Sequence, residues 1–254
     1  MTVASEWSVD TRRLYLCTAD RADRASFVES CVRGGVDVVQ LRDKVLPDRE
    51  LIRAAFEIKR VCNALGVPFL MNDRPDLAVA VDADGVHVGQ DDASPVEARR
   101  TVGPDRLVGL STHTLAELEA AVGMHRQTPL PDNSESTGET CGPAPVDYLS
   151  AGPVKPTPTK PGRPGTGIGY IAAAIDRSPW PVWITGGVTP ETVGELVAVG
   201  ARHFVAVRWL TGSSDPRQAA ADLRGAIDRA IDRTEAESDT DPEPRDPGRG
   251  ALGP

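Results

Sequence analysis

The chain has 254 residues, which suffice for one large domain or two small ones with a substantial core. Its formal net charge is -9 and no element concentrates basic residues, which argues against a general binder of nucleic acid or anionic membranes. No run approaches the roughly twenty apolar residues that span a bilayer, and the opening stretch lacks the apolar run of a signal peptide. We therefore expect a cytoplasmic protein without nucleic-acid or membrane partners.

Short runs rich in β-branched residues alternate with helical patterns along most of the chain. The predicted strands are residues 13–18, 37–42, 68–72, 85–89, 106–111, 146–151, 181–186 and 203–208. Alternating strands and helices predict parallel pairing, and eight such units in this length fit a single-domain (β/α)8 TIM barrel of the α/β class. A doubly wound open sheet is the alternative, weakened because no GxGxxG motif follows the first strand.

Helix ends carry their own signals. The amphipathic stretch 48–66 ends on Gly66, a predicted C-cap. Thr114, with Glu117 three residues on, has the spacing of a capping box. A third helix is predicted to begin with Thr189 as N-cap and Pro190 at the first helical position, and to end at Gly200.

Three segments fall outside the barrel pattern of residues 13–233. Residues 1–12 form an N-terminal extension. Residues 124–145 are polar and rich in Pro, Gly, Ser and Thr, and we interpret them as a mobile insertion before the sixth strand. Residues 234–254 form an acidic tail with almost no apolar content, so burial cannot offset its ordering entropy and we expect disorder.

The cysteines do not indicate a metal site or a disulfide framework. Cys17, Cys31, Cys62 and Cys141 have no CxxC spacing and no matching histidine pair. We expect Cys17 and Cys31 to be small apolar residues of a strand and a helix. The histidines are weak signals as well: His87 lies inside an apolar strand and is expected to be a satisfied core residue, and His113 has no paired nucleophile.

Polar residues follow the predicted strands, at the end of a barrel where active sites form. They are Gln40, Arg42 and Lys44; Asn72 and Asp73; Gln90, Asp91 and Asp92; Ser111, Thr112 and His113; and Thr157, Thr159 and Lys160. Singly, each has an ordinary explanation. Asp73 and Asp92 could cap helices, and Arg42 and Lys44 could form a rim salt bridge.

Together these residues favour chemistry on phosphates. Asp73 and Asp92 end adjacent strands, and paired carboxylates suit Mg²⁺, which takes one or two of them plus phosphate oxygens and water. Arg42, Lys44 and Lys160 place cations on the same rim. The "TGG" and "VRW" stretches after strands seven and eight offer backbone N–H groups where this fold usually holds a monophosphate. The residues thus predict a diphosphate site beside a monophosphate site.

Five stretches, "VVQLRDK", "MNDRPDLAVAVDADGVHVGQDD", "GLSTHT", "DYLSAGPVKPTPTKPG" and "ITGGVTPE", resemble the thiamine-phosphate synthase family in order and spacing, over about residues 13–230. The resemblance implies a transferase that joins a hydroxymethylpyrimidine diphosphate to a thiazole phosphate and releases pyrophosphate. It assigns Asp73 and Asp92 to Mg²⁺. The pyrimidine diphosphate would be bound by Gln40, Leu41, Arg42, Asp43, Lys44, Asn72, Ser111 and Lys160, and the thiazole phosphate by Thr157, Pro158, Thr159, Gly187, Val207 and Arg208.

The resemblance also implies which residues are catalytic: Lys160, Ser111, Arg42 and Lys44. Of these, Lys160 would reach the leaving diphosphate. Two positions depart from the family pattern. Lys155 replaces a usual aromatic residue, and Arg208 replaces a small one and could strengthen the monophosphate site.

Two other functions remain open. A thiazole tautomerase of the same barrel family would use a rim histidine such as His113 for proton transfer, but would not need Asn72, Asp73, Asp92 and Lys160. A non-catalytic barrel that binds thiazole phosphate or thiamine phosphate is the other alternative. The partners expected are small-molecule substrates, and the sequence leaves the oligomeric state open, a homo-oligomer included.

Overall fold

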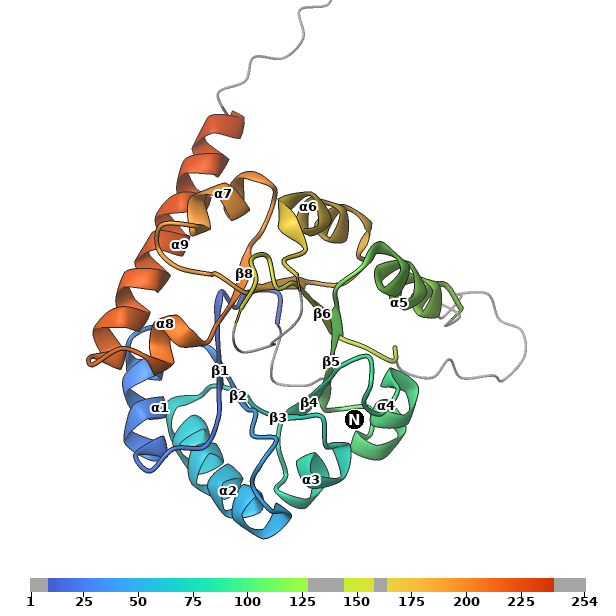
Figure 1. The fold of residues 1–254 in the computed structure, drawn as a ribbon, viewed down its shortest axis with the longest axis vertical. Coiled ribbons are helices and arrows are strands. Elements are labelled where there is room, and N and C mark those ends of the chain that lie inside the picture. Colours follow the sequence, from blue (N-terminus) through green and yellow to red (C-terminus); the bar gives the residue numbers. More distant parts are fainter. Residues whose placement is uncertain (1–8, 128–143, 158–163, 240–254) are drawn as a thin grey trace, which may run out of the picture.

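The computed structural model describes residues 9–127, 144–157 and 164–239. Its strands form one closed parallel barrel in the order β1 to β8, and helices surround it (Figure 1). The strands are β1 Leu14–Thr18, β2 Val38–Leu41, β3 Phe69–Asn72, β4 Gly85–Val88, β5 Leu107–Thr112, β6 Tyr148–Ala151, β7 Val182–Thr185 and β8 His203–Ala206. The TIM barrel predicted from the sequence is confirmed and the open sheet is excluded, because β1 pairs with both β2 and β8.

The helices follow the strands in turn. They are α1 Arg24–Arg33, α2 Asp48–Leu65, α3 Pro75–Ala80, α4 Pro95–Val102, α5 Leu115–Gln127, α6 Gly167–Arg177, α7 Val193–Ala198, α8 Arg208–Thr211 and α9 Pro216–Asp239. The long helix α9 packs against α1 and α7, and so covers the barrel where its first and last strands meet (Figure 1). No helix among the described residues is long and apolar enough to cross a membrane.

Side chains of one strand alternate between two cores. On β1, Leu16 points outward and packs with the helices, whereas its neighbours Tyr15 and Cys17 point into the barrel. Leu41 on β2 points outward in the same way. The barrel interior also holds Leu70, Tyr148 and Trp183, all essentially inaccessible to solvent. Because both faces of every strand are covered, the strands consist almost entirely of buried residues, as in other all-parallel sheets.

Carboxylates close the N-terminal end of the barrel. Asp37, just before β2, accepts hydrogen bonds from the backbone N–H groups of Arg13 and Leu14, at 2.9 and 3.0 Å. Asp147, just before β6, accepts the N–H of Val108 at 2.6 Å and pairs with the buried Arg99 at 2.6 Å. These aspartates provide acceptors for N–H groups at the starts of neighbouring strands, which would otherwise be buried without partners.

Most predicted helix ends agree with the structure. Gly66 caps α2 with φ 68°, a left-handed conformation that glycine adopts without strain. The hydroxyl of Thr114 accepts the N–H of Glu117 at 3.2 Å, as predicted. The prediction for Thr189 is wrong: α7 begins one turn later, at Val193, because the Thr192 hydroxyl accepts the N–H of Thr189 and folds the residues before the helix into a turn.

The segments outside the barrel begin later than predicted. Helix α5 continues to Gln127, so the first residues of the expected insertion are helical. Helix α9 continues to Asp239, past the expected start of the tail at residue 234. The polar composition of residues 234–239 concealed this extension, because the buried apolar residues of the helix, such as Leu223, Ile227 and Ile231, all lie before it. Residues 1–8, 128–143 and 240–254, including Cys141, lie outside the described residues.

Candidate active site

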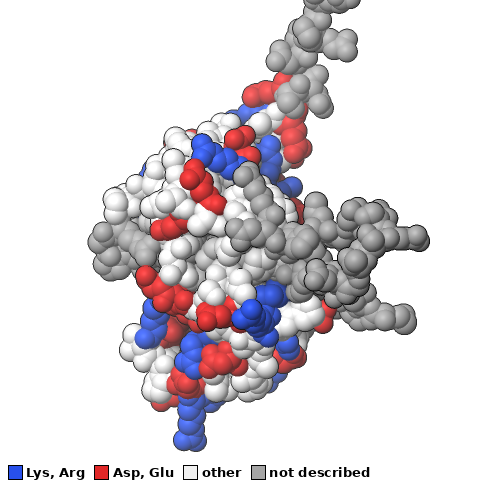
Figure 2. All heavy atoms as spheres, turned by 90° about the vertical axis from the view of Figure 1, so that its right-hand side faces the viewer, with Lys and Arg blue, Asp and Glu red and all other residues white. Residues whose placement is uncertain are grey.

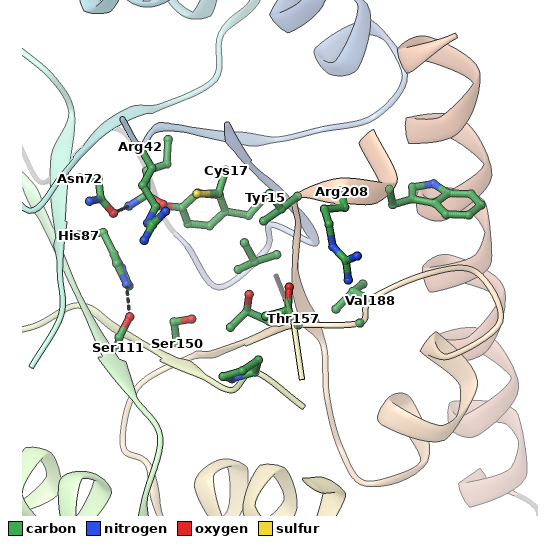
Figure 3. Close-up of a pocket in the computed structure, with 18 of the residues that line it drawn as sticks. Tyr15, Cys17, Arg42, Asn72, His87, Ser111, Ser150, Thr157, Val188 and Arg208 are labelled. Carbon is green, nitrogen blue, oxygen red and sulfur yellow. Dashed lines mark hydrogen bonds between the residues drawn. The ribbon is translucent and has the colours of Figure 1, made fainter. Parts of the chain in front are cut away.

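A cavity opens at the C-terminal ends of the strands, in the middle of the barrel (Figure 3). Its walls include side chains or backbone from β1, β2, β3, β4, β5, β6, β7 and β8 or the loops that follow them. Predicted site residues that line it are Gln40, Arg42, Asn72, Ser111, Thr157, Gly187, Val207 and Arg208. One cavity therefore gathers residues that lie far apart in the sequence.

The first part of the wall is polar and buried. Gln40 on β2 donates from Nε2 to Asn72 Oδ1 on β3, at 3.2 Å, and both side chains are buried. Ser111 on β5 stands nearby, its hydroxyl 2.9 Å from Nε2 of His87 (Figure 3). The Ser111 carbonyl accepts from Gln90 Nε2 at 2.7 Å, which ties the loop after β4 to β5. Arg42 lines the cavity beside this group and brings a positive charge to it.

A cluster of charges lies at the rim, next to this wall. Asp73 follows β3 with φ 61°, and its N–H donates to the His87 carbonyl at 2.8 Å. Asp92 accepts the N–H of Gly89 at 2.8 Å. Burial, a hydrogen bond to Asp92 and the charge of Asp92 raise the pKa of Asp73, against the opposing effect of Lys44, whose ammonium lies 2.7 Å away. Two carboxylates face each other here with one cation beside them.

This cluster has the donors that a divalent cation needs. Two like charges held side by side disfavour the ionised state of both, and a cation between them removes that repulsion. Mg²⁺ typically takes one or two carboxylates from the protein and fills its remaining positions with water and phosphate oxygens. Asp73 and Asp92 fit that donor set as a pair, and the described ranges contain no group of three or more His, Cys, Asp or Glu side chains placed to hold a metal ion.

The far part of the wall is built on a glycine turn after β7. Gly186 and Gly187 have φ 85° and 86°, and a Cβ on Gly186 would lie 2.3 Å from Pro153. Only glycine therefore allows this turn to approach the loop after β6 so closely. Thr157, Val207 and Arg208 line the cavity around the turn. Arg208, at the start of α8, adds a second positive charge to the cavity (Figure 3).

Some predicted site residues lie elsewhere. The Leu41 side chain is buried in the outer core between strands and helices, so it does not line the cavity. Asp43 points into its own loop and accepts the N–H groups of Val45 and Leu46, both at 2.9 Å. Although burial works the other way, these donors lower the pKa of Asp43. Asp43 thereby stabilises the turn that carries Arg42 and Lys44. Pro158, Thr159 and Lys160 lie outside the described residues.

Lys155, one of the two departures from the family pattern, and His113 both pair with glutamates. Lys155 pairs with Glu195 at 3.4 Å, and both side chains are half exposed. His113 Nδ1 lies 3.0 Å from a carboxylate oxygen of Glu117, and His113 is absent from the described cavity wall. A tautomerase that uses this histidine would need it to face the substrate. Its placement therefore gives that alternative no support.

Sequence reasoning missed several residues of the cavity wall, among them Tyr15, Ser150 and Thr185. His87 was predicted to be a satisfied core histidine, and it does have hydrogen-bond partners on both ring nitrogens, but it also lines the cavity. These residues could have been found only from the register of neighbouring strands, which the sequence does not give. Asn72 is paired with His87, and Ser111 with Ser150, so these neighbours share the inward face of the barrel.

Comparison with known proteins gives a consistent result. The family model described as thiamine monophosphate synthase matches residues 14–128 and 132–210. The thiamine-phosphate synthase of Thermobifida fusca is 40% identical over 220 residues, covering 85% of this chain and 92% of that protein. The thiamine-phosphate synthase of Mycolicibacterium vanbaalenii is 39% identical over 237 residues, covering 87% and 97%. Among solved structures, thiamine phosphate pyrophosphorylase from Pyrococcus furiosus has a TM-score of 0.71 at 25% identity, covering 86% of this chain and 96% of that one.

Proposed function

The chain belongs to the thiamine monophosphate synthase family, and we propose that its cavity joins a hydroxymethylpyrimidine diphosphate to a thiazole phosphate. Membership makes it an enzyme of thiamine phosphate synthesis. The detailed reaction class is a transfer of an alkyl group: the pyrimidine methylene moves from a diphosphate oxygen to the thiazole nitrogen. The residues around the cavity support this chemistry in two separate parts of its wall.

The reaction balances without a base. The C–O bond between the pyrimidine methylene and the diphosphate breaks, and its electron pair leaves on pyrophosphate. The aminopyrimidine ring delocalises the positive charge on the methylene. The thiazole nitrogen then forms the C–N bond with its lone pair and gives thiamine phosphate. Because that nitrogen carries no proton, the step needs no residue to remove one.

The first part of the wall and the rim beside it suit the diphosphate. Arg42 and Lys44 supply charge, Ser111 and Asn72 supply neutral donors, and Lys160, outside the described residues, would add a third cation by its place in the sequence. Fixed donors that face the departing oxygens stabilise negative charge as it develops and lower the barrier to cleavage. Mg²⁺ held by Asp73 and Asp92 would neutralise further diphosphate charge when bound.

The glycine turn and α8 suit the thiazole phosphate. Arg208 can pair with the monophosphate, and Gly187 and Val207 line the cavity beside it. Thr157 adds a hydroxyl, and Pro158 and Thr159 follow it in the chain beyond the described residues. Binding energy at this end holds the thiazole nitrogen in line with the methylene carbon, which lowers the entropic cost of their reaction.

The observation that carries the proposal is that Arg42, which follows β2, and Arg208, at the start of α8, line one cavity (Figure 3). Two arginines against an acidic background match two separate phosphorylated ends. Elsewhere charge is mixed: on the face in Figure 2, acidic and basic side chains alternate over the surface. A single extended basic patch, which nucleic acid would need, is not visible on that face.

An assay of thiamine phosphate formation tests the proposal. Purified protein would be given both substrates with Mg²⁺, and a second sample would contain EDTA. We expect product and equimolar pyrophosphate with the metal, and little of either in EDTA. Isomerisation of the thiazole without any condensation would favour the tautomerase, and binding of thiazole phosphate without either reaction would favour the non-catalytic barrel.

A further inference from the structure

Four polar side chains form a continuous chain beside the cavity, and Tyr15, His87 and Ser111 line its wall. The phenol oxygens of Tyr15 and Tyr148 lie 3.3 Å apart inside the barrel. Tyr148 Oη lies 3.1 Å from His87 Nδ1, and His87 Nε2 lies 2.9 Å from Ser111 Oγ, where the chain reaches the cavity (Figure 3). Each of these side chains is buried. The chain therefore joins the two buried tyrosines of the barrel interior to Ser111 in the cavity wall.

Counting protons fixes how this chain can be arranged. Burial, first of all, raises the pKa of Tyr15 and of Tyr148, so both phenols keep their protons. A neutral imidazole has one N–H donor and one acceptor nitrogen, and serine has one O–H. Four protons are thus available for the contacts Tyr15–Tyr148, Tyr148–His87 and His87–Ser111. The three contacts use three of these protons, so one is left over, and it belongs to Tyr15, Tyr148 or Ser111. In the second case Tyr148 accepts from both Tyr15 and Nδ1–H of His87.

The surroundings of these three hydroxyl groups decide between the arrangements. Tyr15 borders the cavity but is only 2% exposed, and both it and Tyr148 pack in a buried cluster with Leu70 and Trp183. The indole N–H of Trp183 is already a buried donor with no hydrogen-bond partner in the described part of the chain. A second unpaired donor there would be costly, since a buried donor without an acceptor loses its full hydration. At the other end Ser111 faces the cavity, where a diphosphate offers oxygen acceptors.

We propose that Tyr148 and His87 are positioning residues that hold Ser111 as a hydrogen-bond donor toward the diphosphate. Tyr15 donates to Tyr148, Tyr148 donates to Nδ1 of His87, and Nε2–H of His87 donates to Ser111 Oγ. The Ser111 proton is then directed into the cavity. Alone, Ser111 could turn its proton to the imidazole and present a lone pair to an anion. The inference rests on the proposed function, because it assigns the Ser111 proton to that substrate.

The consequence for catalysis lies in the charge that develops on the leaving group. As the C–O bond breaks, negative charge on the departing diphosphate grows, and a donor fixed in place beforehand stabilises it without reorganisation. An interaction that strengthens with this charge lowers the barrier more than it tightens binding. Loss of the chain should therefore reduce kcat more than it raises KM.

The tautomer of His87 is the first test. Nitrogen-15 NMR of the intact protein distinguishes an Nε2–H imidazole from an Nδ1–H one, and the chain has four histidines, so His87→Gln identifies the signal. We expect Nε2–H in the wild type and a shift of the Nδ1 resonance in Tyr148→Phe. An Nδ1–H tautomer in the wild type would reverse the chain and overturn the inference, whatever the activity of the enzyme.

A double-mutant cycle is the second test. His87→Gln alone should lower kcat roughly 10-fold, about the worth of one hydrogen bond to a charged group. In a Ser111→Ala background the same change should have almost no effect, because the residue through which His87 acts is gone. Equal losses in both backgrounds would show that His87 acts independently of Ser111. Absence of all condensation in the wild type would instead refute the proposed function and leave the tautomer result standing.

His203 provides a matched control. It is also a buried barrel histidine, it contacts Trp183 with ring centroids 5.1 Å apart, and its Nδ1 is bonded to the Arg12 carbonyl at 2.6 Å, at the opposite end of the barrel. His203→Gln should leave kcat unchanged even where it lowers the melting temperature. A loss of kcat equal to that of His87→Gln would mean that any disturbance of the barrel interior slows the enzyme, and would contradict the inference.

Discussion

The two ends of the barrel use carboxylates in opposite ways. At the N-terminal end, Asp37 and Asp147 have partners supplied by the chain itself: strand N–H groups and the arginines Arg224 and Arg99. Burial raises the pKa of Asp37, but the donors and cations around it oppose this rise. At the C-terminal end burial also raises the pKa of Asp73, and there a second carboxylate, Asp92, adds to the rise while Lys44 opposes it. The carboxylates of one end have partners within the chain, and those of the other are where the proposed function places Mg²⁺.

The difference indicates where this protein gains stability and where it gains function. A buried carboxylate with matched donors contributes to folding, and its removal leaves donors and charges without partners. A pair of facing carboxylates contributes repulsion to the empty protein and affinity to the loaded one. Substitution of a carboxylate should therefore lower stability at the N-terminal end and activity at the C-terminal end.

The largest expected effect is at the C-terminal end. By its place in the sequence Lys160 should contact the leaving diphosphate, so Lys160→Ala should lower turnover roughly 100- to 1000-fold, about 3–4 kcal/mol in the barrier. Affinity for the thiazole phosphate should change far less. His113→Ala is the control, since His113 pairs with Glu117 and is not part of the described wall. The rates of thiamine phosphate formation and of thiazole isomerisation are both measured. Loss of activity in His113→Ala together with normal activity in Lys160→Ala would support a tautomerase.

A comparable change at the N-terminal end should act on stability. Asp147→Ala leaves the buried Arg99 without its carboxylate, which should cost about 3 kcal/mol of the free energy of unfolding. Turnover of the folded protein should stay normal, because Asp147 lies across the barrel from the cavity. Urea unfolding and initial rates measure the two quantities. A large loss of kcat with normal stability would contradict the division between the ends.

The facing carboxylates also predict a pH dependence. Because the folded protein raises the pKa of Asp73, it binds this proton more tightly than the unfolded chain does. Stability from this group is therefore greatest in acid and falls as pH rises above the ordinary carboxyl value of about 4. Asp73→Asn should flatten that fall, and so should Mg²⁺ added to the wild type. Melting temperatures across pH, compared between wild type and variant, would refute this if the two curves ran parallel.

The smallest effect on activity and stability is expected from the C-terminal tail, which belongs to neither end of the barrel. Removal of residues 240–254, which have little apolar surface to bury, should leave turnover and melting temperature nearly unchanged. A cut at residue 235 is a different experiment, because it would remove the last turn of α9. Loss of activity in the shorter deletion would show that the tail takes part in one of the two ends.

Periodicity and turn chemistry predicted much of this molecule. β-branched runs located the strands to within one or two residues, and the closed barrel followed from their number and their alternation with helices. Positions where two local bonds compete were not predictable, such as Thr189, whose N–H is taken by the Thr192 hydroxyl. The C-terminal end of α9 was also missed, because residues 234–239 are polar and the buried apolar residues of the helix lie before them.

For the site, the sequence predicted which residues gather at the rim but not how they pair. The contact of Asp73 with Asp92 depends on the register of β3 with β4, which places Asn72 beside His87. The chain from Tyr15 to Ser111 depends in the same way on residues of separate strands meeting inside the barrel. Such pairings are tertiary, and single-sequence patterns carry no information about them.

The most direct test of the contrast between the ends is a magnesium titration of the initial rate. Wild type, Asp73→Asn and the control Asp147→Asn would be compared at saturating concentrations of both substrates. The account predicts that Asp73→Asn needs far more Mg²⁺ for half-maximal rate and turns over poorly, whereas the folded Asp147→Asn variant has the metal requirement of the wild type. Normal turnover of Asp73→Asn in EDTA, or an equal rise in metal requirement in both variants, would contradict it.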